Sequence, residues 1–118
     1  MEYIYSAQSC WAKRTGNLLY CSGLTPIDPA PMQIEAITIG EQRKRAIDNL
    51  DIALQAGGLT LINVVKNQCF YSGYGLFSQM NATYTACFGG HRPASSTMAV
   101  KGLSHDAMVE IACIAQYN

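Results

Sequence analysis

The segment over residues 107–116, AMVEIACIAQ, constrains the fold most, because as a strand it is apolar on both faces. Successive side chains of a strand point to opposite faces of the sheet. Two apolar sets result, one of Val109, Ile111, Cys113 and Ala115 and the other of Met108, Ala112 and Ile114. A sheet that contains this strand therefore needs a cover on each of its two faces.

Hydrophobic periodicity predicts the other elements of the chain. Strands are predicted at residues 17–23, 62–71, 95–101 and 107–116, with a further strand at 10–14. Three prolines follow the first of these in TPIDPAP and end regular structure there. Helices are predicted after residue 38 and over residues 76–88. This order of strands and helices predicts a mixed sheet in which both helices act as crossover connections and lie on the same face.

The first helix has a recognisable beginning and end. Thr38 and Glu41 have the spacing of a capping box, and Gly57 with Gly58 offers a left-handed stop. Between them, apolar residues recur at three and four positions, which predicts one buried face. The basic run over residues 43–45 is interpreted as part of the solvated face of this helix.

Composition indicates that part of the surface is buried against another chain. The 118 residues have room for one domain, predicted over residues 1–118. Charged residues make up only 14% of the chain, whereas hydrophobic residues make up 49%. Since two helices on one face leave the other face of the sheet uncovered, we expect sheets of neighbouring subunits to associate. Glu110 lies on that second face.

Several function classes are disfavoured by the charge and residue pattern. The formal net charge is zero, which argues against nucleic acid as a partner. The five cysteines lack any CxxC pair, so neither a disulfide framework nor a zinc site is expected, and the chain is predicted to be cytoplasmic with no membrane segment. His91 and His105 have no metal-ligand spacing, and no glycine-rich loop precedes a helix. We expect no metal and no nucleotide cofactor.

Two polar features could carry chemistry. Glu110 interrupts an apolar strand, which costs free energy unless its carboxylate is paired, hydrogen-bonded or protonated. It is either a catalytic carboxylate or an interface group bound to backbone N–H groups or to an arginine of another chain. Ser95, Ser96 and Thr97 are consecutive hydroxyl residues at the start of a strand, and they either face a ligand or merely suit a strand edge.

The ordered combination of five stretches resembles the Rid or YjgF-like family, the reactive-intermediate deaminases also described as L-PSP endoribonucleases. The stretches are GNLLYCSGLTPIDP (16–29), RAIDNLDIALQAGG (45–58), VVKNQCFY (64–71), FSQMNATYTACFGGHRPA (77–94) and VEIACIA (109–115). The resemblance implies an α+β fold of the chorismate-mutase type, with a mixed sheet and two helices on one face. It also implies a homotrimeric barrel, with clefts between subunits lined by the strand after HRPA.

The resemblance implies a partly altered ligand pocket. In the deaminases of this family an arginine after proline-alanine clamps the substrate carboxylate, and a cysteine lies two residues further on. Here Ser95 occupies the arginine position and Thr97 the cysteine position. Arg92 is the alternative cation for a carboxylate. Ser9, in AQSCWA, stands where the family's GPYSQA segment has a tyrosine that reaches the pocket.

Other family positions are kept. Gly23 matches the ligand-facing loop, Asn81 lies in NATY, and Glu110 matches the glutamate thought to orient a water. The resemblance therefore implies an imine or enamine hydrolase, or a tautomerase, that acts on a small pathway intermediate without a cofactor. Small 2-imino acids are expected to bind weakly without the arginine. The alternatives are a non-catalytic trimer that binds a metabolite or a protein, and an endoribonuclease, which the neutral charge disfavours.

Overall fold

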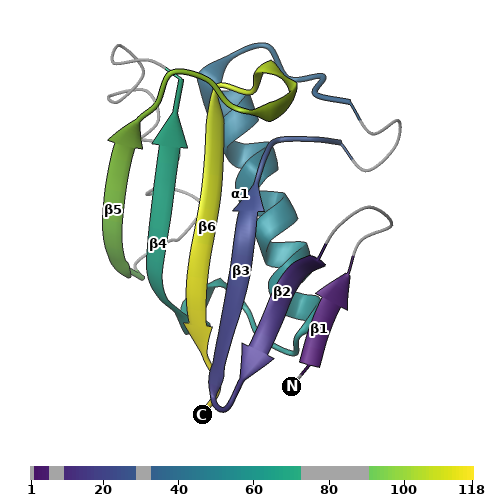
Figure 1. Ribbon diagram of the computed structural model, residues 1–118, viewed down its shortest axis with the longest axis vertical. Helices are drawn as coiled ribbons and strands as arrows, with labels where there is room; N and C mark the ends of the chain where they lie inside the picture. Colours follow the sequence, from purple (N-terminus) through teal and green to yellow (C-terminus); the bar gives the residue numbers. More distant parts are fainter. Residues whose placement is uncertain (1, 6–9, 29–32, 73–90) are drawn as a thin grey trace.

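The computed structural model describes residues 2–5, 10–28, 33–72 and 91–118, of which residues 2–5, 10 and 11 are described by their backbone alone. Within this part of the chain, six strands form one mixed sheet in the order β1-β2-β3-β6-β4-β5 (Figure 1). The strands are β1 (Glu2–Tyr5), β2 (Cys10–Thr15), β3 (Leu18–Leu24), β4 (Val64–Tyr71), β5 (Ala94–Ala99) and β6 (Val109–Gln116). The mixed sheet expected from the sequence is confirmed.

Strand pairing is antiparallel except at one edge. β4 and β5 run parallel, with Asn67 beside Ser95 and Cys69 beside Thr97. β6 lies between β3 and β4 and is antiparallel to both. The strand that the sequence marks as apolar on both faces is thus central in the sheet, while β5 forms an edge.

Helix α1 (Ile39–Ala56) covers one face of the sheet, behind β3 and β6 in the view of Figure 1. Its start is the predicted cap: the Thr38 hydroxyl accepts from the backbone N–H of Glu41 at 3.1 Å and donates to the Glu41 carboxylate at 2.7 Å. At the other end the left-handed residue is Gly58, with φ +83°, which a residue with a Cβ would adopt only with strain.

The core lies between α1 and the sheet. On β6 the side chains of Val109, Ile111, Cys113 and Ala115 are buried, as the alternation predicts. They pack with Leu50 and Leu54 of α1 and with buried residues of β3 and β4. Ala112 and Ile114 are only half-buried, because they lie on the open face that α1 does not cover, whereas the half-buried Met108, expected on the same face, packs against the core.

Arg43 corrects the interpretation of the basic run in α1. It was expected on the solvated face, but its side chain is fully buried, with a relative exposure of 0%. Its guanidinium points to β4, where it donates to the Cys69 sulfur at 3.3 Å. Lys44 is exposed and forms an ion pair with Asp48, so the prediction holds for that residue.

The other predicted strands are confirmed within a few residues of their predicted bounds. The short 3-10 helix η1 (Leu61–Asn63) replaces the first residues of the strand predicted at 62–71. β1 was not predicted. The helix predicted at 76–88 lies outside the described residues. The described cysteines Cys21, Cys69 and Cys113 are free, and the described helix is neither long nor apolar enough to cross a membrane.

Candidate functional site

Glu110 and Gly23 are neighbours on the open face of the sheet. The carboxyl group of Glu110 lies so close to the Gly23 backbone that a Cβ at position 23 would be 2.7 Å from the Glu110 Cδ. Real Cβ atoms do not approach other atoms so closely, so glycine provides the space for this carboxylate. Glu110 is half-buried, and within the described residues its carboxylate accepts no hydrogen bond and forms no ion pair.

A β-bulge in β3 brings the two residues together. Cys21 pairs with Cys113 and Leu24 pairs with Ile111, so β3 has one residue more than β6 between these pairs. Side chains of a regular strand alternate between the two faces, so residues three positions apart would point to opposite faces. The extra residue shifts this alternation by one, and both Cys21 and Leu24 are therefore buried. Gly23 lies within the bulge, and its backbone faces Glu110.

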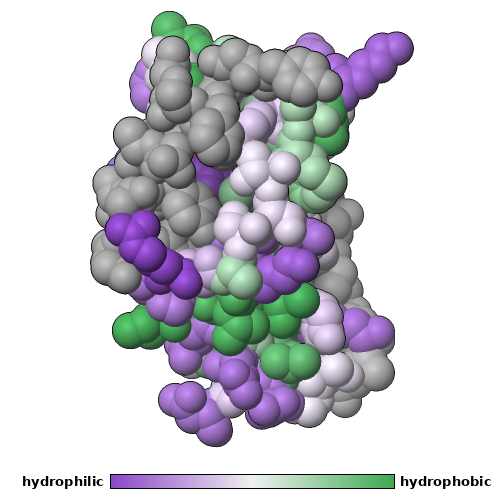
Figure 2. All heavy atoms as spheres, turned by 90° about the vertical axis from the view of Figure 1, so that its left-hand side faces the viewer, coloured by the Kyte–Doolittle hydropathy of each residue, from purple (hydrophilic) through white to green (hydrophobic). Residues whose placement is uncertain are grey.

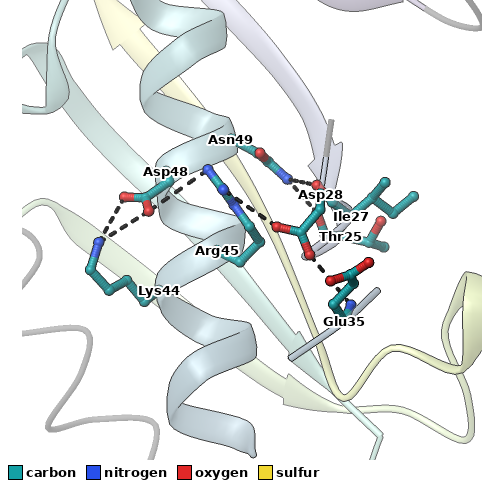
Figure 3. Close-up of polar contacts among 8 residues, drawn as sticks. All are labelled: Thr25, Ile27, Asp28, Glu35, Lys44, Arg45, Asp48 and Asn49. Carbon is teal, nitrogen blue, oxygen red and sulfur yellow. Dashed lines mark hydrogen bonds and ion pairs between the residues drawn. The ribbon is translucent and has the colours of Figure 1, made fainter. Parts of the chain in front are cut away.

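Helix α1 holds the loop that follows the bulge (Figure 3). The side-chain amide of Asn49 donates to the carbonyl oxygens of Thr25 at 3.1 Å and Ile27 at 2.8 Å. Arg45 reaches Asp28 at 3.5 Å and Asp48 at 3.8 Å. Asn49 is buried, and its two hydrogen bonds hold the chain just after Gly23 against α1.

The open face also has a shallow pocket of about 170 Å³. It is lined by Tyr20, Cys21, Lys66, Gln68, Ala112, Cys113 and Ile114. Ala112 and Ile114 follow Glu110 at alternate positions of β6, so the pocket continues the same face. A largely apolar recess beside an unpaired carboxylate is suited to a small molecule or to side chains of another chain.

Ser95 and Thr97 lie on the other side of the sheet. Because β4 and β5 are parallel neighbours, Ser95 and Thr97 share the helix-facing side with Asn67, Cys69 and Tyr71. A hydrogen bond confirms that the Ser95 side chain points to this side: its hydroxyl donates to the side-chain amide oxygen of the buried Asn67 at 3.0 Å. Figure 2 faces this edge, where a column of weakly polar surface runs beside strongly hydrophilic groups.

A buried polar cluster lies behind these two hydroxyls. We call Arg43, Asn67, Cys69 and Tyr71 the polar cluster. Arg43 donates to Cys69, and Cys69 donates to the Asn67 oxygen at 3.5 Å. Burial raises the pKa of the Cys69 thiol, and the Arg43 guanidinium offsets part of this rise. Burial also raises the pKa of Tyr71, and the Thr97 hydroxyl partly offsets this rise.

The predicted site residues are thus brought together in two groups. Glu110 and Gly23 meet on the open face, whereas Ser95 and Thr97 meet the polar cluster on the helix-facing side. Among the described residues of one chain these groups lie on opposite faces of the sheet, so a joint pocket would need a second copy of the chain. Ser9 and Asn81 lie outside the described residues.

Arg92 is exposed at the entrance to β5. The neighbouring His91 holds this segment against β4, since its ring nitrogen Nε2 lies 2.7 Å from the carbonyl oxygen of Val64. The exposure of Arg92 leaves it accessible to a ligand or to another chain.

The polar cluster was missed by reasoning from the sequence. Asn67 and Cys69 read as ordinary positions of a strand, and Arg43 as a surface residue. One signal was present: the apolar alternation of β4 is interrupted by an asparagine on its buried face. A buried amide needs hydrogen-bond partners, and that need points to further polar groups nearby.

Comparison with known proteins identifies the family. The family described as "Endoribonuclease L-PSP" matches residues 5–117, so the chain belongs to it, and the resemblance to Rid or YjgF-like proteins is confirmed. A RutC family protein of Pyrococcus abyssi is 35% identical over 104 residues, which cover 88% of this chain and 82% of the relative.

Two further comparisons bear on activity and fold. The 2-iminobutanoate/2-iminopropanoate deaminase of Escherichia coli K12 is 33% identical over 103 residues, which cover 85% of this chain and 80% of the relative. A crystal structure from Thermotoga maritima superposes with a TM-score of 0.94 at 34% identity and covers 100% of this chain and 98% of its own. The fold and the general Rid-type relationship are therefore established.

Proposed function

We propose that the chain hydrolyses a small imine or enamine in a pocket between subunits, with Glu110 orienting the attacking water. One observation carries the proposal: the Glu110 carboxylate is unpaired within the described chain and lies in a space that Gly23 provides. An apolar strand would form a more stable sheet without a carboxylate at this position. A functional reason for its presence is therefore the simplest one.

The chemistry needs only a base and a bound water. The carboxylate of Glu110 accepts a proton while the water oxygen attacks the electrophilic carbon of the C=N bond. The resulting carbinolamine carries a hydroxyl and an amine on the same carbon. Proton transfer to the nitrogen and cleavage of the C–N bond then release ammonia and leave a carbonyl product. Atoms and charges balance without a cofactor.

Association of sheets supports a pocket of this kind. Tyr20 is 45% exposed, and Phe70, Ala112 and Ile114 are half-buried on the same open face. Apolar groups that a single chain leaves uncovered favour contact with another copy. A homotrimer, as the family resemblance implies, would cover this face and would bring Glu110 close to groups of a neighbouring subunit.

A non-catalytic binding protein is the second candidate. The observation that favours it concerns Ser95. Its hydroxyl already donates a hydrogen bond to Asn67, and it carries no positive charge. A small metabolite would still fit between subunits, but no side chain at this position would hold a carboxylate as firmly as a guanidinium does.

Replacing Glu110 by glutamine tests the catalytic proposal. Glu110→Gln keeps the shape of the side chain but cannot accept a proton, so turnover of small imines should fall by about 10²–10⁴-fold. The melting temperature and oligomer mass should stay close to those of the wild type. Glu35→Gln changes an exposed carboxylate in a loop beside α1 and is the matched control. Full activity of Glu110→Gln, or dissociation and a large loss of stability, would refute the catalytic role.

A further inference from the structure

The Ser95 hydroxyl is the exposed end of a hydrogen-bond chain that starts at a buried arginine. Arg43 donates to the sulfur of Cys69 at 3.3 Å, and Cys69 donates to the oxygen of Asn67 at 3.5 Å. Ser95 donates to that same oxygen at 3.0 Å. Arg43 and Asn67 both have a relative exposure of 0%, so the hydrogen bonds between them are shielded from water.

Arginine fixes the direction of these hydrogen bonds. A guanidinium has five N–H donors and no acceptor, so the Cys69 sulfur must accept from it. The proton of the thiol then points to Asn67, which sets the amide with its oxygen toward Cys69 and Ser95. Because this oxygen carries no proton, the bond to Ser95 uses the serine's own hydroxyl proton.

This series of hydrogen bonds requires that the Cys69 thiol keep its proton. Burial disfavours the thiolate and raises the pKa of Cys69, and this effect is larger than the opposite effect of the Arg43 charge. The thiol is therefore protonated at neutral pH and remains a donor. The Ser95 hydroxyl has one donor and two lone pairs, so with its proton engaged it can only accept from a ligand.

We propose that Ser95 is a specificity-determining residue that accepts a hydrogen bond from the ligand, so that the site prefers an amide or another N–H or O–H donor group to a carboxylate. The inference rests on the proposed function only in placing the ligand at Ser95. A carboxylate there would meet an oxygen lone pair, whereas an amide NH₂ would donate to it. Arg43 is buried and separated from the surface by Cys69 and Asn67, so it acts as a positioning residue.

A matched pair of small ligands tests this preference. 2-Oxobutanamide and 2-oxobutanoate share one carbon skeleton and differ in the group that would meet Ser95. Isothermal titration calorimetry on the full chain should give a Kd for the amide that is about tenfold lower than that for the carboxylate. Equal affinities, tighter binding of the carboxylate, or binding of neither ligand would overturn the proposal.

Three variants identify the residue responsible. Ser95→Ala should abolish most of the amide preference, whereas Ser96→Ala should keep it, because Ser96 pairs with Gln68 on the opposite side of the sheet. Asn67→Val removes the acceptor and releases the serine proton, so the preference should shift toward the carboxylate. If Asn67→Val fails to fold, the comparison of Ser95→Ala with Ser96→Ala still shows whether Ser95 sets the amide preference. An unchanged preference in Ser95→Ala would overturn the proposal.

The binding experiment is independent of turnover. An amide preference in a protein that hydrolyses no imine would support this inference and count against the deaminase proposal. Conversely, Glu110-dependent turnover of carboxylate-bearing imines, with tight binding of 2-oxobutanoate, would support the deaminase proposal and overturn the role of Ser95.

Discussion

The carboxyl group of Glu110 rests on the backbone of Gly23, within the β-bulge that adds one residue to β3. A glycine and a glutamate from strands far apart in the sequence thus form one structural unit. Substitutions at either residue should affect the other, and each half of the unit can be tested by itself.

Gly23→Ala should displace the Glu110 side chain. The new Cβ would lie 2.7 Å from the Glu110 Cδ, so the flexible glutamate must move away. Since misplacement of a catalytic group by about 1 Å can cost 10²-fold in rate, we expect a loss of turnover of this order with a small change in melting temperature. Gly102→Ala is the control, because a Cβ there meets nothing within 4 Å. Wild-type turnover in Gly23→Ala would show that the position of Glu110 is unimportant.

The uncovered open face predicts association with other copies of the chain, and the family resemblance implies that the assembly in solution is a trimer. Light scattering on a sizing column should give about three times the 12.8 kDa of one chain. Ile114→Glu places a charge on the half-buried open face and should dissociate the assembly, because burial of an unpaired charge is costly. Ile62→Glu, at a side chain that is 70% exposed, should leave the mass unchanged. A wild-type monomer would remove the basis for a pocket between subunits.

The missing arginine predicts weak activity toward 2-imino acids. Ser95 carries no charge, so it should hold the carboxylate of 2-iminobutanoate less firmly than a guanidinium would. Coupling the protein to a dehydratase and timing the release of keto acid should show little acceleration, and Ser95→Arg should increase it. Strong wild-type acceleration would point to another cation, for which the exposed Arg92 is the candidate.

Asn49 should contribute strongly to stability. Asn49→Ala removes two hydrogen bonds, at 3.1 and 2.8 Å, to the carbonyl oxygens of Thr25 and Ile27. Loss of these bonds should lower the free energy of unfolding by about 1–3 kcal/mol in a urea titration. Gln55→Ala, which removes only an exposed hydrogen bond to Asp51, should change it by less than about 0.5 kcal/mol. Equal effects of the two variants would contradict the anchoring role.

Cys69 should make the protein less stable in alkali. Burial raises the pKa of its thiol above the ordinary 9.0. Above about pH 9 the unfolded chain therefore loses this proton while the folded protein keeps it. The free energy of unfolding then decreases with pH until the pH passes the folded pKa. Urea titrations on either side of pH 9 measure this decrease in the free energy of unfolding. Cys69→Val should make the decrease smaller, whereas Val65→Ala on the same strand should leave it unchanged. An equal decrease with pH in Cys69→Val and in the wild type would contradict this role of Cys69.

Most of the described fold could be predicted from local signals. The cap at Thr38, the glycine at position 58 and the alternation in β6 each depend on neighbours within a few residues. β1 was missed although Tyr3, Ile4 and Tyr5 are residue types that favour strands, because so short a segment gives little periodicity. Periodicity does not predict the pairing that joins Glu110 to Gly23, although the family resemblance places both residues at the site.

The members of the polar cluster could not be predicted because they depend on contacts across the fold, although the asparagine on the buried face of β4 indicates that polar partners are present. The surroundings of Arg43 are set by Cys69, which is distant in sequence and belongs to another element. The face on which Ser95 lies is set by the parallel register with β4, and shifting that register by one residue would turn the side chain to the other face. Periodicity identifies a strand, but it does not state which neighbour the strand will have.

The bulge in β3 also constrains the length of the chain. Cys21 and Leu24 both point into the core only because one residue more than the ladder requires lies between them. A deletion of one residue there would leave two outcomes: Leu24 would turn out of the core, or the strand beyond it would slip against β6. Insertions and deletions in homologous sequences should therefore avoid this point. At the bulge the fold constrains the number of residues as well as their type.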